Sequence, residues 1–69
     1  MSKQYTILVN FAKPWRTRVR SDLDKYKKNS AHGAYQIGKD GVWYLPVYTG
    51  TKTEAMRIAG TLKTISASM

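Results

Sequence analysis

The sequence predicts an α+β domain with a three-stranded antiparallel sheet and two helices on one face of it, in the order β-α-β-β-α. Three observations lead to this prediction. Apolar residues alternate near the N-terminus, recur at helical spacing in two later segments, and flank a turn sequence in between. With 69 residues, the chain reads as one small basic domain over residues 1–69.

The first predicted element is a strand over residues 5–11. Apolar or aromatic side chains stand at every second position there, at Tyr5, Ile7, Val9 and Phe11. A period of two is typical of a strand with one face on a core.

The second predicted element is a helix over residues 14–28. Pro14 suits a first helical turn because that turn does not use its missing N–H. Trp15, Val19, Leu23 and Tyr26 follow at spacings of four, four and three, which places them on one helical stripe. Residues 29–33 contain Asn, Ser and Gly and are predicted to form a loop.

A hairpin and a helix are predicted for the rest of the chain. Residues 34–37 and 42–48 are rich in aromatic and branched side chains, and a Gly-Lys-Asp-Gly turn separates them. Pro46 cannot donate to a sheet ladder, so its strand should lie at an edge, or its partner strand should end before Pro46. Thr51 and Glu54 fit a capping box, and apolar spacing continues the second helix to Ile65.

One core is expected from these elements, because layering brings the apolar stripes of the helices onto the sheet. Its predicted members are Trp15, Val19, Leu23, Ile7, Val9, Ile58 and Leu62.

The composition excludes several classes of site. The chain has no cysteine and one histidine, which rules out disulfides and thiolate zinc sites. Three of the four carboxylates have structural explanations, as a cap, a turn residue and a helix-surface partner, and no nucleophile or orienting acid stands out near His32. We therefore expect a protein that is not an enzyme and that needs no metal or cofactor.

The longest apolar run near the N-terminus, at residues 7–9, is much shorter than the core of a signal peptide or a membrane span. This predicts a cytoplasmic protein that does not associate with a membrane.

Positive charge is concentrated in residues 13–28, which hold seven Lys or Arg and two Asp and so supply five of the eight net positive charges. On the predicted helix, Arg16, Arg20 and Lys27 share one flank of the apolar stripe, and Arg18 and Lys25 share the other. Such an excess indicates a polyanionic partner. The alternative is a solvated outer helix face.

Tyrosines provide a second indication. If Trp43, Leu45 and Val47 face the helices, then Tyr44 and Tyr48 face outward, and Tyr35 joins them across the hairpin. Outward-facing strand aromatics can stack on unpaired bases. They can equally stabilise the sheet by packing on one another, and the faces exchange if Pro46 marks a bulge.

Two functions fit these patterns. The first is nucleic-acid binding, single-stranded or nonspecific, with cations on phosphates and tyrosines on bases. The second is a small inhibitor or regulator, of the kind that phages encode, that docks on an acidic protein surface as a monomer or as a homodimer through a sheet edge. Cations and aromatics on one shared face would favour nucleic acid. The candidate binding residues are Arg16, Arg18, Arg20, Lys25, Lys27, Lys28, Tyr35, Tyr44 and Tyr48.

The segment Val-Trp-Tyr-Leu-Pro-Val followed by Glu-Ala-Met-Arg-Ile-Ala-Gly-Thr-Leu-Lys, within residues 42–63, resembles the second half of a SPOR repeat. In that family a strand leads through a short turn into a helix that contains Glu-Ala and ends in Leu-Lys. The resemblance implies an RNP-type sheet. Members of the family bind peptidoglycan glycan strands, but here the resemblance is used for the fold alone.

Overall fold

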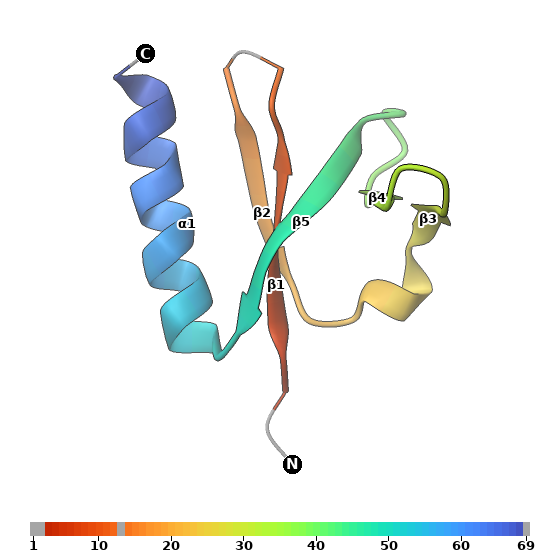
Figure 1. Ribbon diagram of the computed structural model, residues 1–69, viewed down its shortest axis with the longest axis horizontal. Coiled ribbons are helices and arrows are strands. Elements are labelled where there is room, and N and C mark those ends of the chain that lie inside the picture. The colour runs from red at the N-terminus through yellow and green to blue at the C-terminus, as the bar shows by residue number, and fades with distance from the viewer. Residues whose placement is uncertain (1–2, 13, 69) are drawn as a thin grey trace.

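In the described part of the chain, five strands come first and one α-helix follows them (Figure 1). A computed structural model describes residues 3–12 and 14–68; Lys13, the first residue of the basic segment, lies outside them. The elements are β1 (Tyr5–Asn10), β2 (Arg16–Arg20), the 3-10 helix η1 (Leu23–Lys25), β3 (Lys27–Asn29), β4 (Ala34–Gln36), β5 (Trp43–Gly50) and α1 (Lys52–Ala67).

All neighbouring strands pair antiparallel, in the order β2-β1-β5-β4-β3. The chain is therefore an α+β protein with five strands and one α-helix in its described part, and the prediction of three strands and two helices was wrong.

β1 confirms the predicted first strand. It lies between β2 and β5, and its residues Ile7, Leu8 and Val9 are fully buried. Both faces of this strand are therefore covered, which explains why Leu8 is apolar although it points away from Ile7 and Val9.

The predicted helix over residues 14–28 is replaced by β2, η1 and β3. Thr17 and Val19 are β-branched and alternate with arginines, which suits a strand. The Asn10 side chain accepts a hydrogen bond from the Ala12 N–H at 2.9 Å and so helps to turn the chain after β1. Pairing with β1 then gives this segment long-range backbone hydrogen bonds that an isolated helix would lack.

The turn before β4 was predicted correctly. The Asn29 side chain accepts hydrogen bonds from the Ala31 and His32 N–H groups at 3.0 and 3.3 Å. Gly33 adopts a φ of +66°, which an L side chain rarely tolerates. The chain reverses here, and β3 pairs with β4.

The hairpin of β4 and β5 is also confirmed. Asp40 accepts a hydrogen bond from the Val42 N–H at 3.1 Å, and Gly41 has a φ of +78°. β4 pairs only with Trp43 and Tyr44 of β5. On the β4 side the partner strand thus ends before Pro46, as the second expectation required, whereas on the other side Leu8 of β1 lies opposite Pro46 and β5 is not an edge strand.

α1 begins where the capping motif predicted. Thr51 is the N-cap, and its hydroxyl accepts a hydrogen bond from the Glu54 N–H at 3.2 Å. The reciprocal half of the capping box is not formed, because the Glu54 carboxylate accepts a hydrogen bond from Arg57 at 2.7 Å instead. The cap is therefore a single hydrogen bond, which the Thr51 side chain accepts.

The core lies between the sheet and α1. Two small helix residues, Ala55 and Ala59, are buried against Ile7 and Val9. Partly buried side chains surround this cluster; they are Tyr5, Trp15, Val19, Tyr48, Ile58 and Leu62. Six of the seven predicted core residues are thus confirmed. The exception is Leu23, which is half-buried in η1 and outside the cluster because the helix that would have placed it there does not form.

Candidate nucleic-acid interface

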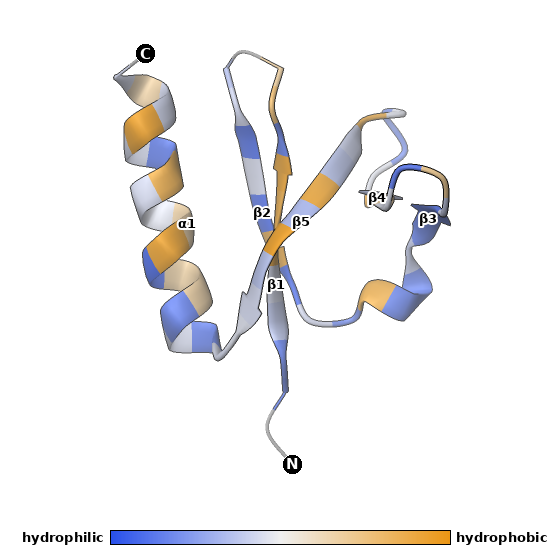
Figure 2. Cartoon of the chain, in the orientation of Figure 1, coloured by the Kyte–Doolittle hydropathy of each residue, from blue (hydrophilic) through white to orange (hydrophobic). Residues whose placement is uncertain are grey.

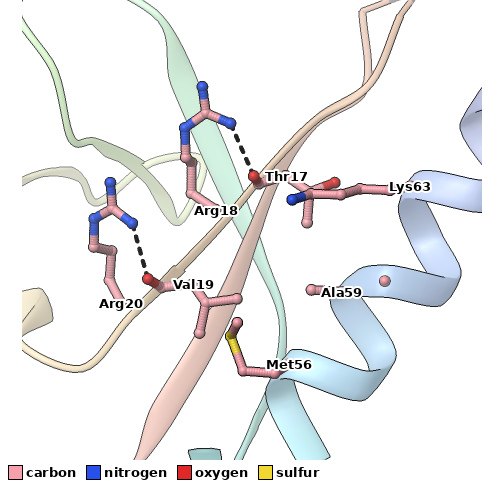
Figure 3. A pocket seen from close by; sticks show the side chains of 8 residues that line it. Thr17, Arg18, Val19, Arg20, Met56, Ala59 and Lys63 are labelled. Carbon is pink, nitrogen blue, oxygen red and sulfur yellow. Dashed lines mark hydrogen bonds between the residues drawn. The ribbon is translucent and has the colours of Figure 1, made fainter.

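Three arginines stand in one row on β2. The strand places Thr17 and Val19 opposite Val9 and Ile7 of β1, on the side that α1 covers. Arg16, Arg18 and Arg20 alternate with them and point to the other side of the sheet. Figure 3 shows Arg18 and Arg20 directed away from α1, whereas Val19 points toward it.

The row of three arginines differs from the arrangement that was expected on the predicted helix. A helix would have placed Arg18 on the flank opposite Arg16 and Arg20. The period of two in a strand brings all three to one face, with alternate residues about 7 Å apart. The charges are therefore more concentrated than the sequence indicated.

The pairing register shows that the face with the three arginines continues across β1 and β5. Arg18 is opposite Leu8, which is opposite Pro46 of β5. Tyr44, two residues before Pro46 and without an intervening bulge, lies on this face too. We call this surface, on the side of the sheet away from α1, the open face. Its residues are Thr6, Leu8, Asn10, Arg16, Arg18, Arg20, Lys28, Tyr35, Tyr44, Pro46 and Thr49, of which Thr6, Leu8 and Tyr44 are buried.

Tyr35 and Lys28 continue the open face onto β4 and β3. Tyr35 pairs with Tyr44, and Lys28 pairs with Tyr35, so the three side chains share a side. The Lys28 ammonium lies over the Tyr35 ring, 5.7 Å from its centroid, at a distance that allows a cation–π contact. Tyr35 is half-buried, whereas Tyr44 is buried.

Two of the predicted stacking tyrosines do not have the expected environment. Tyr44 reaches the side away from α1 but is only 3% exposed, so its ring has no free surface for a base. Tyr48 was predicted to face outward, and this is wrong. The ladder shifts register between Ile7 and Leu8, leaving Val47 as the additional residue. Tyr48 therefore lies opposite Ile7 and packs against the helix-side core.

Two predicted cations lie away from the open face. Lys27 is opposite Gln36 and one position from Lys28, so it points to the other side of β3. Lys25 is in η1, 3.7 Å from the Asp22 carboxylate and over the Tyr26 ring at 5.8 Å. Six of the nine predicted site residues thus lie on the open face, with the arginine row on β2 and Lys28 on β3, the two outermost strands of the sheet.

The five strands contain no Asp or Glu, and they contain five Lys or Arg residues. Figure 2 shows hydrophilic colouring along β2 and β3, with hydrophobic segments on β5 and α1. The one carboxylate beside the arginine row is Asp40, whose oxygen is 3.9 Å from Arg16, and both side chains are more than half exposed. Such a contact neutralises little.

Arg18 and Arg20 form no ion pair within residues 3–12 and 14–68. Their guanidinium groups donate instead to the backbone oxygens of Thr17 and Val19, each at 2.9 Å. Each guanidinium has five N–H donors, so most of its hydrogen-bonding capacity stays available to a ligand.

Sequence reasoning missed the polar groups on either side of Leu8 on the open face. The Thr6 and Thr49 hydroxyls are hydrogen-bonded at 3.0 Å, and the Asn10 amide donates to the Trp43 carbonyl at 2.9 Å. The alternation along β1 could have identified Thr6 and Asn10, because they lie on the side opposite Ile7 and Val9. Thr49 could not be found in this way, since the bulge before it reverses its side.

Other kinds of site have little support in the described residues. No group of three His, Asp or Glu residues there is arranged to hold a metal ion. His32 is exposed in the turn after β3. In the same part of the chain, α1 is neither long nor apolar enough to cross a membrane.

No family model, curated protein or solved structure matches the chain. The resemblance to a SPOR repeat over residues 42–63 therefore stays a prediction. The function must be argued from the open face itself.

Proposed function

We propose that this protein binds nucleic acid with low sequence specificity through the open face. The observation that supports this most strongly is the row of Arg16, Arg18 and Arg20, on the same face as Lys28 and Tyr35 and on strands without a carboxylate. Cations and an aromatic side chain on one surface match the needs of a phosphate backbone and its bases.

The arginines are the phosphate-binding groups of this proposal. Guanidinium groups recognise phosphate oxygens through two parallel hydrogen bonds. The hydrogen bonds that Arg18 and Arg20 now make are partly buried and go to backbone oxygens of their own strand. Exchanging them for bonds to phosphate is favourable, since a phosphate carries a full negative charge and accepts two parallel hydrogen bonds from one guanidinium.

Tyr35 takes the stacking role that the sequence assigned to Tyr44. Tyr35 is half-buried and the Lys28 ammonium lies over its ring, so a base that stacks on Tyr35 would displace Lys28 toward the phosphate of the same nucleotide. An unpaired base can reach such a ring, whereas a base inside a duplex cannot. The proposed preferred ligand is therefore single-stranded.

The test compares a variant that lacks two arginines of the open face with a variant that loses the same charge from α1. Arg18→Gln with Arg20→Gln should weaken binding to single-stranded oligonucleotides of all sequences and lower the slope of log affinity against log salt by about 1.4, the value for two phosphate contacts on a single strand. Lys52→Gln with Arg57→Gln removes the same charge from α1 and should change the slope much less. Equal effects of the two double variants, or no binding by the unmodified protein at low salt, would refute the proposal.

A second measurement separates stacking from charge. Tyr35→Leu should weaken single-strand binding by about 1–3 kcal/mol while leaving the salt slope and duplex binding nearly unchanged.

A protein-binding regulator is a second candidate, and a different feature favours it. β2 is an outermost strand with a groove beside it.

A further inference from the structure

A groove runs between β2 and α1, on the side of β2 that faces away from β1 (Figure 3). It consists of two adjoining hollows of about 490 and 320 Å³, which share Thr17, Arg18 and Lys63 as lining residues. The shared residues make the hollows one continuous feature along the strand. Val19 and Met56 line one end, and Trp15 and Ser66 line the other.

The backbone of β2 is accessible along this groove. β1 is the strand that pairs with β2, and β2 is outermost in the sheet. The Thr17 and Val19 carbonyls accept hydrogen bonds from the Arg18 and Arg20 guanidinium groups. In an antiparallel ladder, alternate residues direct their backbone groups to opposite sides. A further strand beside β2 would use its N–H groups to bind the Thr17 and Val19 carbonyls. The two guanidinium groups now occupy these acceptors.

The groove is positively charged. Arg16, Arg18, Arg20 and Lys63 line it, and none of the described residues that line either hollow is Asp or Glu. A second copy of this chain is a poor occupant, because pairing through β2 would bring two arginine rows together in a protein of net charge +8. The charge complement is an acidic segment.

We propose that this groove binds an extended acidic segment of another protein, which adds to the sheet as a strand beside β2. On binding, the guanidinium groups of Arg18 and Arg20 pass from the backbone carbonyls to carboxylates of the segment. Its N–H groups then take over those carbonyls, so that each hydrogen bond is replaced. This inference differs from the nucleic-acid proposal because it uses the edge of β2 and α1, although both proposals use Arg18 and Arg20.

The geometry predicts the sequence pattern of the segment. Its side chains on the arginine side should be Asp or Glu, because directly opposed residues on neighbouring strands interact. The alternate side chains enter the groove between Val19 and Met56 and should be apolar. Gly60 makes the groove wide at this point, since nothing lies within 4 Å of the position that a Cβ on Gly60 would take.

The first experiment measures binding of a labelled peptide that alternates glutamate and valine over the length of β2. We expect it to bind, and we expect a peptide of the same composition with all glutamates placed before the valines to bind at least about tenfold more weakly. Alternate N–H groups of the bound peptide would point toward β2, and the others would point away from it. Methylating the first set of backbone nitrogens should abolish binding, and methylating the second set should not. Equal binding of the two peptides, or equal effects of both methylation sets, would overturn strand addition.

The second experiment fills the groove without weakening the fold. Gly60→Leu places a side chain in the groove and raises helix propensity, so the variant should melt no lower than the unmodified protein. It should reduce peptide binding by about tenfold or more. Thr61→Leu, on an exposed position of α1 that does not line either hollow, is the matched control and should bind normally.

The same variant distinguishes the peptide from other occupants. Gly60→Leu should leave oligonucleotide binding and its salt slope unchanged, because Gly60 is not on the open face. Loss of oligonucleotide binding in Gly60→Leu would assign the groove to nucleic acid, and a dimer in solution that this variant dissociates would assign it to a second copy. Either result would overturn the proposal.

Discussion

Thr17 lies directly opposite Val9 in the β1–β2 ladder, and its buried hydroxyl has no hydrogen-bond partner among the described residues. An unsatisfied buried hydroxyl costs stability, whereas an apolar group of the same shape does not. We therefore expect Thr17→Val to stabilise the protein by about 1 kcal/mol in chemical denaturation.

Thr6→Val is the matched control for this prediction. Thr6 is as buried as Thr17, 5% against 4% exposed, but its hydroxyl is hydrogen-bonded to Thr49. This variant should destabilise by about 1 kcal/mol because it leaves Thr49 without that partner. If both variants shifted stability in the same direction, the assignment of the Thr17 hydroxyl as unpartnered would be wrong.

Replacement of Ile7 and of Leu23 by alanine should lower the free energy of unfolding by different amounts. Ile7 is fully buried in the cluster beneath α1, so Ile7→Ala should destabilise by about 2–5 kcal/mol. Leu23 is half-buried and outside the cluster, and Leu23→Ala should cost only about 1 kcal/mol. Urea unfolding of both variants measures the difference. An equal or larger loss for Leu23→Ala would favour the helix that the sequence predicted.

The N-cap of α1 predicts a second stability difference. Thr51→Ala removes the acceptor of the Glu54 N–H and should lower the free energy of unfolding by about 1 kcal/mol. Thr53→Ala, at an exposed position in the first turn, should be neutral or slightly stabilising because alanine has the higher helix propensity. Neither change touches the open face, so oligonucleotide binding should be unaffected. A loss of binding in folded Thr51→Ala would show that this turn has a role in recognition.

The ion pair at the start of α1 predicts a pH dependence. The hydrogen bond and the charge of Arg57 lower the pKa of Glu54 from its ordinary value of 4.5. A carboxylate whose pKa is lowered by folding stabilises the folded state above the unfolded pKa, and this contribution is lost as the pH falls through the folded pKa. In Arg57→Gln the pKa of Glu54 should rise toward 4.5. An NMR titration of the Glu54 carboxyl carbon checks this, and an unchanged pKa would exclude the pair in solution.

The segment over residues 14–28 shows why the fold was only partly predictable. Trp15, Val19 and Leu23 are four residues apart, and a spacing of four places side chains on one side of a helix and also on one side of a strand. Thr17 and Val19 favour a strand, while Pro14 suits a helix start. Local sequence could not separate the two structures, and pairing with β1 decided between them.

Most residues of the candidate site could be predicted from the sequence, but the way they are arranged on the sheet could not. The charge excess identified Arg16, Arg18 and Arg20, but their common face depends on the strand that replaced the helix. Tyr48 was assigned to the wrong side because a bulge at Val47 reverses the alternation of β5. The burial of Tyr44 likewise depends on its tertiary surroundings.

The sequence by itself determined the features that depend on few neighbouring residues. These are the net charge, the absence of cysteine, the alternation of β1, the turn before β5 and the Thr51 cap. Tertiary structure alone decided that residues 16–20 pair with β1, that the register shifts between Ile7 and Leu8, and that α1 leaves a groove beside β2. Those features depend on hydrogen bonds and packing between segments that are distant in the chain, which local periodicity does not encode.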